Sequence, residues 1–96
     1  MPAAKAYVYL LTCADDTYYI GTARDVAARV AVHNTGKGAK YTRPRRPVTV
    51  AWQEGPMTVS RALRREYQLK QLTRAQKEKL ITGALVIKLP RRAKVR

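Results

Sequence analysis

The sequence predicts one domain of mixed α/β class, with elements in the order strand, strand, helix, strand, helix, helix. Two short runs rich in Tyr, Val and Leu flank a polar turn, and later segments carry apolar residues at helical spacing. The chain has 96 residues, of which 46% are hydrophobic, so it has room for one hydrophobic core and not for two. We expect a domain over residues 1–89 and a mobile basic tail over residues 90–96.

The N-terminal segment predicts a β-hairpin, with strands over residues 5–12 and 18–22 and turn formers over residues 14–17. A hairpin centred near Ala14 would place Tyr9 roughly opposite Tyr19 on one face, with the two hydroxyl groups close together. Tyrosine is also an ordinary filler of half-buried sheets. The presence of six Tyr and no Phe favours hydroxyl groups that are needed.

The next segment predicts a helix over residues 25–34, with Asp25 suited to its start and Gly36 to its end. Its residues at helical spacing are Val26, Ala27, Val30 and Ala31. Arg29 and His33 are four residues apart beside this apolar stripe, so they can share a site. Taken singly, Arg29 is equally explained as a surface or phosphate-binding cation, and His33 as a residue favoured by the helix dipole.

Residues 36–47, GKGAKYTRPRRP, predict a basic loop, because two glycines, two prolines and five cations forbid a regular element. A third strand is expected over residues 48–53, with a break at Gly55-Pro56. A strongly amphipathic helix should follow over residues 58–72. Thr73 and Gln76 have the spacing of a capping box, which predicts a last short helix to about Thr82.

Glu66 occupies the middle of the apolar stripe that we predict for the 58–72 helix. The stripe consists of Val59, Ala62, Leu63 and Leu69, with Lys70 beside it. A carboxylate that faces the protein needs a partner, because its desolvation is costly. That partner is either a cation such as Lys70, in a structural ion pair, or a divalent metal whose other ligands are water.

The net charge of +14 calls for an anionic partner. Nucleic acid is favoured over an anionic membrane, because no segment reads as a basic amphipathic surface helix or a membrane span. One cysteine, Cys13, and one histidine exclude an internal disulfide and an ordinary Cys/His zinc site. The first residues do not resemble a signal peptide, so a cytoplasmic location is expected.

Several motifs in a fixed order resemble the GIY-YIG nuclease superfamily, and most closely its small single-domain bacterial members. Tyr19-Ile20-Gly21 is intact and the first triplet appears as Tyr7-Val8-Tyr9. The segment GTARDVAARVAVHN is similar to the helix that carries the family's arginine and a frequent histidine, here Arg29 and His33. The segments GKGAKYTRPRRP and RREYQLKQLTRAQKEKLI are similar to the loop and the glutamate helix of the small members, which places the metal-binding carboxylate at Glu66. The resemblance covers about residues 6–81.

This resemblance implies a three-stranded antiparallel sheet flanked by helices, and hydrolysis of nucleic-acid phosphodiesters with one divalent metal, Mg²⁺ or Mn²⁺, held by Glu66. Arg29 would bind the phosphate, and Tyr9 or Tyr19 would take the proton of the attacking water. His33 would relay the proton or contact phosphate. Tyr7 replaces the glycine of the first triplet, and the asparagine that many members carry beyond the glutamate helix is absent.

A binding module without turnover is the main competing hypothesis, a nucleic-acid or ribosome-associated adaptor on the same fold. A structural domain whose charge only gives solubility is a third. Cations of the basic loop would neutralise phosphates under the first two hypotheses, and Tyr41 would stack on a base or pack on the loop. The expected nucleic-acid contacts are Lys37, Lys40, Tyr41, Arg43, Arg45, Arg46 and Lys70. A domain this small is expected to select nucleic-acid structure rather than sequence, DNA more than RNA, in repair or recombination, with a monomer favoured.

Overall fold

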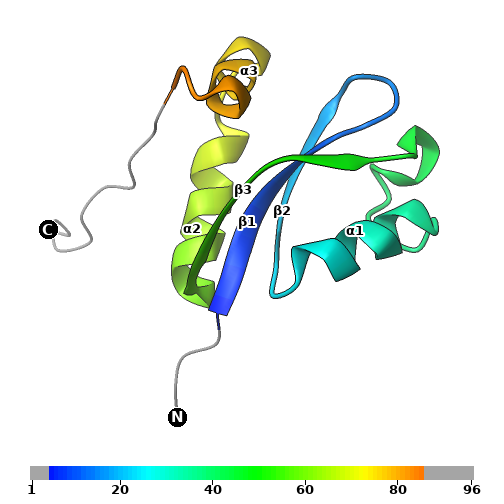
Figure 1. Cartoon of the computed structure of the whole chain (residues 1–96), viewed down its shortest axis with the longest axis horizontal. Coiled ribbons are helices and arrows are strands. Elements are labelled where there is room, and N and C mark those ends of the chain that lie inside the picture. Colours follow the sequence, from blue (N-terminus) through cyan, green and yellow to red (C-terminus); the bar gives the residue numbers. More distant parts are fainter. Residues whose placement is uncertain (1–4, 86–96) are drawn as a thin grey trace, which may run out of the picture.

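Three antiparallel strands form the centre of the domain in the computed structural model, which describes residues 5–85 (Figure 1). Their order is β2-β1-β3, so the first strand lies in the middle. The elements are β1 (Lys5–Thr12), β2 (Tyr18–Ala23), α1 (Val26–Asn34), the 3₁₀ turn η1 (Arg43–Arg45), β3 (Thr49–Thr58), α2 (Val59–Lys70) and α3 (Arg74–Thr82). The predicted order ββαβαα and the mixed fold class are confirmed. The expected tail over residues 90–96 lies outside the described residues.

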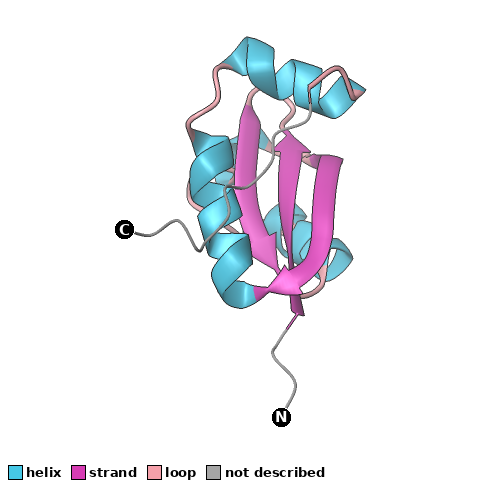
Figure 2. Ribbon diagram, turned by 90° about the vertical axis from the view of Figure 1, so that its left-hand side faces the viewer, coloured by secondary structure: helices cyan, strands magenta, loops and turns pink. Residues whose placement is uncertain are grey.

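The sheet is covered on both faces. α2 lies along one face and α1 along the other, while α3 crosses near one end (Figure 2). Val8 and Leu10 of β1 pack in one cluster with Leu69 of α2, and Tyr9 and Leu11 point to the other cluster, with Val26 of α1. Because its side chains alternate between two covered faces, β1 is apolar over nearly its whole length.

The hairpin is centred one residue later than predicted, on Asp15. Thr12 pairs with Tyr18, and Tyr9 therefore lies opposite Gly21, not opposite Tyr19. The partner of Tyr9 on β2 is thus two residues later than predicted, which keeps Tyr9 and Tyr19 on one face as diagonal neighbours, with ring centroids 6.5 Å apart. The expectation that the two tyrosines share a face holds, while the expected register is wrong.

β3 does not break at Gly55-Pro56, as we predicted, but continues to Thr58. Ala6 pairs with Met57 and Val8 with Glu54, so two steps along β1 correspond to three along β3. The extra residue is a β-bulge, which accommodates a proline that has no N–H for the ladder.

The predicted helix caps are present. Asp25 accepts a hydrogen bond from Ala28 N–H, and Thr73 and Gln76 form the complete capping box at the start of α3. In α1, however, Ala27 and Ala31 are exposed, and the buried stripe runs through Val26 to His33. The two alanines are the smallest members of the predicted stripe. The larger side chains of Val26 and His33 are buried against the rest of the domain, and they determine which face of α1 is turned inward.

The buried face of α2 is centred differently from the prediction. Ala62 and Leu69 are buried, but Val59 and Leu63 are exposed. Arg65 takes the place between the buried residues, because Glu54 of β3 pairs with its guanidinium at 2.6 Å. This rotation moves Glu66 from the middle of the buried face to its border.

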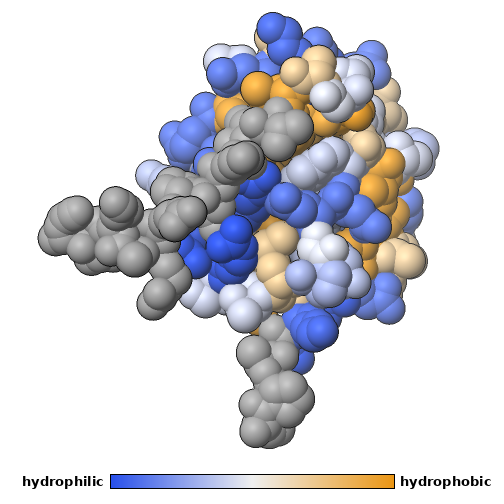
Figure 3. Space-filling model, turned by 60° about the vertical axis from the view of Figure 1, so that its left-hand side comes forward, coloured by the Kyte–Doolittle hydropathy of each residue, from blue (hydrophilic) through white to orange (hydrophobic). Residues whose placement is uncertain are grey.

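Polar residues dominate the outer surface, with apolar groups between them, on the face drawn in Figure 3. Among residues 5–85 no helix combines the length and the apolar character that a membrane crossing requires. Cys13 is buried in the cluster around Tyr9 and behaves as a small apolar residue.

Candidate active site

Tyr9 lies at the centre of the polar cluster on the α1 face of the sheet. Its ring is 1% exposed. Its hydroxyl group passes directly over Gly21, where a Cβ atom would lie only 2.6 Å from Tyr9 Oη. The glycine of the Tyr-Ile-Gly triplet is therefore required by the tyrosine on the neighbouring strand.

His33 connects this tyrosine to the basic loop. The histidine is buried at the end of α1, with Nε2 3.1 Å from Tyr9 Oη and Nδ1 2.9 Å from Thr42 Oγ1. Its ring also meets Tyr19 edge-on, with centroids 5.3 Å apart. Tyr9, Tyr19 and His33 thus form one contiguous group from two strands and a helix.

Arg29 reaches the same group from one turn earlier in α1. Its guanidinium donates to the Thr22 carbonyl oxygen at 3.4 Å and lies near the Tyr9 hydroxyl group. The rest of the residue is exposed. This places a permanent positive charge at the solvent side of a buried phenol.

Burial and neighbouring charges shift the pKa values of two members in opposite directions. Desolvation raises the pKa of Tyr9 to about 12, helped by the nearby Tyr19 and opposed by Arg29. Desolvation also lowers the pKa of His33 below its ordinary value of 6.5, and Arg29 adds to this effect. At neutral pH the phenol therefore keeps its proton and the imidazole is neutral.

Glu66 lies at the border of this group. The carboxylate of its side chain is 20% exposed and accepts from Lys70 Nζ at 2.7 Å, which is the structural ion pair weighed above. It is near enough to Tyr9 to contribute, as the smallest influence, to the raised pKa of that phenol. A partly exposed carboxylate suits a hard divalent cation that keeps most of its water ligands.

The donor set is therefore one carboxylate. Within residues 5–85, no group of three His, Cys, Asp or Glu side chains could enclose a metal. A single carboxylate near an exposed arginine is compatible with Mg²⁺ or Mn²⁺ bound jointly by protein, substrate phosphate and water, and does not fit a protein-enclosed zinc site.

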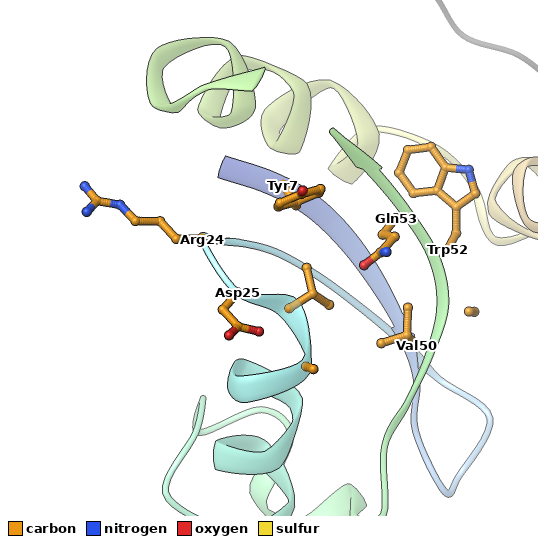
Figure 4. Close-up of a pocket in the computed structure, with 9 residues that line it drawn as sticks. Tyr7, Arg24, Asp25, Val50, Trp52 and Gln53 are labelled. Carbon is orange, nitrogen blue, oxygen red and sulfur yellow. The ribbon is translucent and has the colours of Figure 1, made fainter. Parts of the chain in front are cut away.

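Clefts beside the cluster are open and shallow. One of about 400 Å³ is lined by Arg29 with Ala28 and Val32, and one of about 280 Å³ by Tyr19, Tyr41 and Lys70. A larger groove of about 670 Å³ lies beside the start of α1, where Tyr7 and Gln53 face it and Arg24 points away (Figure 4). None of the five candidate catalytic residues lines this larger groove, so its size does not identify the site.

The basic loop divides into exposed and structurally engaged cations. Lys37, Lys40 and Arg43 are exposed. Arg45 forms an ion pair with Asp15 at 3.0 Å and covers the ring of Tyr41 at 4.0 Å. Arg46 donates to the Arg43 carbonyl oxygen at 2.8 Å and remains exposed.

Tyr41 packs on the loop, which is one of the two roles that the sequence allowed. Arg45 covers one face of its ring, and the ring of Tyr19 stacks at 6.0 Å with 22° between the planes. With these neighbours in place, Tyr41 as a whole remains 40% exposed.

Three residues of the site were not found from the sequence. Thr42 is completely buried against His33, and a Cβ atom at Gly38 would collide with His33 Nδ1. Asn34 fastens the end of α1 to the start of β3, because its side chain accepts from Val48 N–H at 2.8 Å and donates to the Val48 carbonyl oxygen at 3.0 Å. A threonine and a glycine inside a basic loop carry no periodic signal that would mark them as buried.

Comparison with known proteins agrees with this geometry. The family model described as "GIY-YIG catalytic domain" matches residues 5–79. A UPF0213 protein of Staphylococcus haemolyticus is 51% identical over 78 residues, which cover 81% of this chain and 95% of that protein. A UPF0213 protein of Halobacterium salinarum is 57% identical over 74 residues, covering 77% of this chain and 96% of that protein.

Solved structures give the same result for the fold. The solution NMR structure of a UPF0213 protein from Bacillus halodurans has a TM-score of 0.54 and 40% identity, over 82% of this chain and 84% of that one. A solution NMR structure of a protein from E. faecalis has a TM-score of 0.57 and 38% identity, over 91% and 94%. GIY-YIG domains form a nuclease superfamily, which acts on nucleic acid and generally uses a divalent metal. The chain belongs to the GIY-YIG catalytic domain family, among the small UPF0213 proteins.

Proposed function

We propose that this protein is a metal-dependent endonuclease that hydrolyses phosphodiester bonds in nucleic acid. The observation that carries the proposal is the cluster in which a buried tyrosine, a neutral histidine and an arginine converge at the border where Glu66 lies. A purely structural hydrogen-bond network has no need of an exposed guanidinium aimed at the same phenol.

Each residue has a distinct role in the proposed reaction. Arg29 binds the scissile phosphate through its planar guanidinium and stabilises the negative charge that develops in the transition state. A tyrosine hydroxyl group accepts the proton of the attacking water. Since the pKa of Tyr9 is about 12, this phenol must pass on its own proton as it accepts another, and His33 Nε2 lies in hydrogen-bonding distance at 3.1 Å.

Glu66 is the residue that would hold the metal. When bound, Mg²⁺ or Mn²⁺ supplies stabilisation of the phosphoryl oxygen and of the leaving 3′ oxygen. Lys70 Nζ lies 2.7 Å from the Glu66 carboxylate. When that carboxylate binds the metal instead, Lys70 would be available to bind the substrate phosphate.

The substrate class follows from charge and shape. The net charge of +14 and the exposed cations Lys37, Lys40 and Arg43 favour contacts to phosphates, which carry no base sequence. Open clefts on a small domain cannot enclose a long site. We therefore propose selection of branched, nicked or single-stranded structures, in DNA more than RNA, in a cytoplasmic repair or recombination reaction.

A non-catalytic adaptor is the second candidate, and the 2.7 Å ion pair between Glu66 and Lys70 is the observation that favours it. If this pair is the whole role of Glu66, the wild-type protein should bind nucleic acid without cleaving it, and neutralising the carboxylate should leave that binding unchanged. The two candidates thus differ at one residue.

The test uses Glu66→Gln beside Glu78→Gln. Glu78 is a control, because it also forms an i,i+4 ion pair on a helix, with Arg74 at 3.1 Å, at a more exposed place. Nicking of supercoiled plasmid and cleavage of labelled branched and single-stranded DNA and RNA are measured with Mg²⁺, Mn²⁺ or EDTA. We expect metal-dependent cleavage that is lost in Glu66→Gln and kept in Glu78→Gln.

The opposite results are equally informative. Absence of cleavage by the wild-type protein on every substrate, with salt-sensitive binding intact, would support the adaptor. Cleavage that survives in Glu66→Gln would remove this residue from the metal site.

A further inference from the structure

His33 has both ring nitrogens engaged inside the fold, and the direction of the two hydrogen bonds decides which nitrogen can accept a proton. Nε2 lies 3.1 Å from Tyr9 Oη and Nδ1 lies 2.9 Å from Thr42 Oγ1. A neutral imidazole has one N–H, so one of these bonds is donated by the ring and the other is accepted by it.

The surroundings of Thr42 fix the direction at Nδ1. Thr42 Oγ1 lies 2.9 Å from the carbonyl oxygen of Ala39, which can only accept. The single hydroxyl proton of Thr42 is donated to that carbonyl, and a lone pair of Oγ1 then faces His33. Nδ1 is accordingly the nitrogen that carries the proton, and Nε2 is bare.

The surroundings of Tyr9 agree with this direction. The neighbouring Arg29 guanidinium has donors only and cannot take the Tyr9 proton, so the phenol directs that proton to His33 Nε2, 3.1 Å away. With the opposite tautomer, Nε2–H would donate to Oη, and the Tyr9 proton would have no acceptor among these residues.

We propose that Thr42 is a positioning residue that keeps the imidazole proton on Nδ1, so that His33 Nε2 takes the proton of Tyr9 when Tyr9 deprotonates the attacking water. This inference rests on the proposed nuclease function and distinguishes Tyr9 from Tyr19 as the proton acceptor. The water O–H bond breaks as a new Tyr9 O–H bond forms, and the original Tyr9 O–H bond breaks as Nε2–H forms. The water oxygen bonds to phosphorus as the bond from phosphorus to the 3′ oxygen breaks, and the leaving 3′ oxygen keeps the electron pair and takes a proton from solvent. The step leaves an imidazolium at His33 and a neutral phenol.

The fold holds this geometry firmly. Thr42 is completely buried, and Gly38 leaves no side chain between the loop and His33 Nδ1. The lowered pKa of His33 keeps Nε2 bare at neutral pH, and the raised pKa of Tyr9 requires a transfer coupled to His33 rather than a preformed phenolate. The ionisable groups that face His33 are Tyr9, Tyr19 and Arg29.

The tautomer can be read directly, because His33 is the only histidine of the chain. Long-range ¹H–¹⁵N correlation spectra of ¹⁵N-labelled protein at pH 7.5, without substrate or metal, distinguish a protonated from a bare ring nitrogen. Thr42→Val removes the hydroxyl group at nearly constant volume, Thr42→Ser retains it, and Thr42→Ala removes it without adding bulk. Cleavage of a labelled branched DNA with Mg²⁺ is measured for the same four proteins.

We expect the Nδ1–H tautomer in the wild type and in Thr42→Ser. Thr42→Val and Thr42→Ala should show an Nε2–H tautomer or a mixture, with kcat reduced about 10- to 100-fold and KM for DNA unchanged. An Nε2–H tautomer in the wild type overturns the proposal. So does an unchanged tautomer in a folded variant that lacks the hydroxyl group, and Thr42→Ala decides this point if Thr42→Val does not fold.

The spectra also separate this inference from the proposed function. If the tautomers behave as expected but the wild-type protein cleaves nothing, the positioning role of Thr42 stands and the nuclease function fails. If cleavage is present but does not follow the tautomer, the nuclease function stands and the relay is wrong.

Discussion

Tyr9 and Gly21 face each other across β1 and β2, and the hydroxyl group of the tyrosine occupies the space in which a side chain at position 21 would begin. A Cβ atom there would lie 2.6 Å from Tyr9 Oη and 2.8 Å from Cζ. Because the Tyr9 ring is buried between the sheet and α1, it cannot move aside without breaking its contact with His33. The two motif residues are one structural unit.

Gly21→Ala should therefore disrupt the site more than the fold. We expect overpacking to lower the free energy of unfolding by about 1–3 kcal/mol, and cleavage to be lost because Tyr9 Oη leaves His33 Nε2. Urea denaturation and plasmid nicking measure the two effects.

Gly83→Ala is the control for that change. Gly83 has φ of +84° with no atom within 4 Å of an added Cβ, so alanine there costs about 1–2 kcal/mol of backbone strain without touching the cluster. Full nicking activity in Gly21→Ala would contradict the close contact.

The lowered pKa of His33 predicts that acid destabilises the protein. The fold favours the neutral imidazole, so this contribution to stability is complete above the ordinary pKa of 6.5 and is lost as the pH falls through the lower pKa of the folded state. We expect the melting temperature of the wild type to fall between pH 7.5 and 5, and the single histidine Cε1–H signal to titrate below pH 6.5.

His33→Gln should lose most of that pH dependence, although it is less stable throughout. Asp15 does not interfere, because its pKa is lowered from 3.8 by hydrogen bonds from Thr17 and it titrates in a more acidic range. A histidine signal that titrates above pH 6.5 would be incompatible with the neutral, buried ring.

The ion pair between Arg65 and Glu54 should stabilise the fold without serving the site. The Arg65 side chain is 6% exposed and donates to Glu54 Oε1 at 2.6 Å and to Gln68 Oε1 at 2.7 Å. Glu54→Gln should lower the free energy of unfolding by about 1–3 kcal/mol. The loss should be smaller than for a fully buried ion pair, because the Glu54 side chain is 40% exposed. Urea denaturation measures this loss. For Glu78→Gln, whose pair with Arg74 is exposed, it should show a loss in the free energy of unfolding of less than about 0.5 kcal/mol.

The elements could be predicted from the sequence because they depend on local signals, whereas the joining of the tyrosines with Arg29 and His33 in one site was implied by the family resemblance. The capping box at Thr73, the cap at Asp25 and the polar turn of the hairpin are each encoded within a few residues. Tyr9, Tyr19, Arg29 and His33 were expected in one place, and the structure places them together.

The remaining features depend on contacts between distant residues. Arg65 is buried only because Glu54 of another element meets it, and this contact rotates the α2 stripe and moves Glu66 to the border. Thr42 is buried because a loop folds over the end of α1, and the bulge in β3 depends on pairing with β1. Helical spacing and composition contain none of this information.

The cations of the basic loop should differ in their effect on nucleic-acid binding. Lys37 and Lys40 are exposed, whereas Arg45 is held by Asp15 at 3.0 Å and donates to the Tyr41 carbonyl oxygen at 2.7 Å. Lys37→Ala/Lys40→Ala should therefore reduce the slope of log K against log salt by about one unit for each lost phosphate contact and leave stability unchanged. Arg45→Ala should lower the melting temperature and change the salt slope less than the lysine pair does. Fluorescence anisotropy with labelled DNA at several salt concentrations measures the slope of each variant. If Arg45→Ala flattens the slope as strongly as the lysine pair, its guanidinium exchanges Asp15 for phosphate in the complex, and the loop binds nucleic acid with all of its cations.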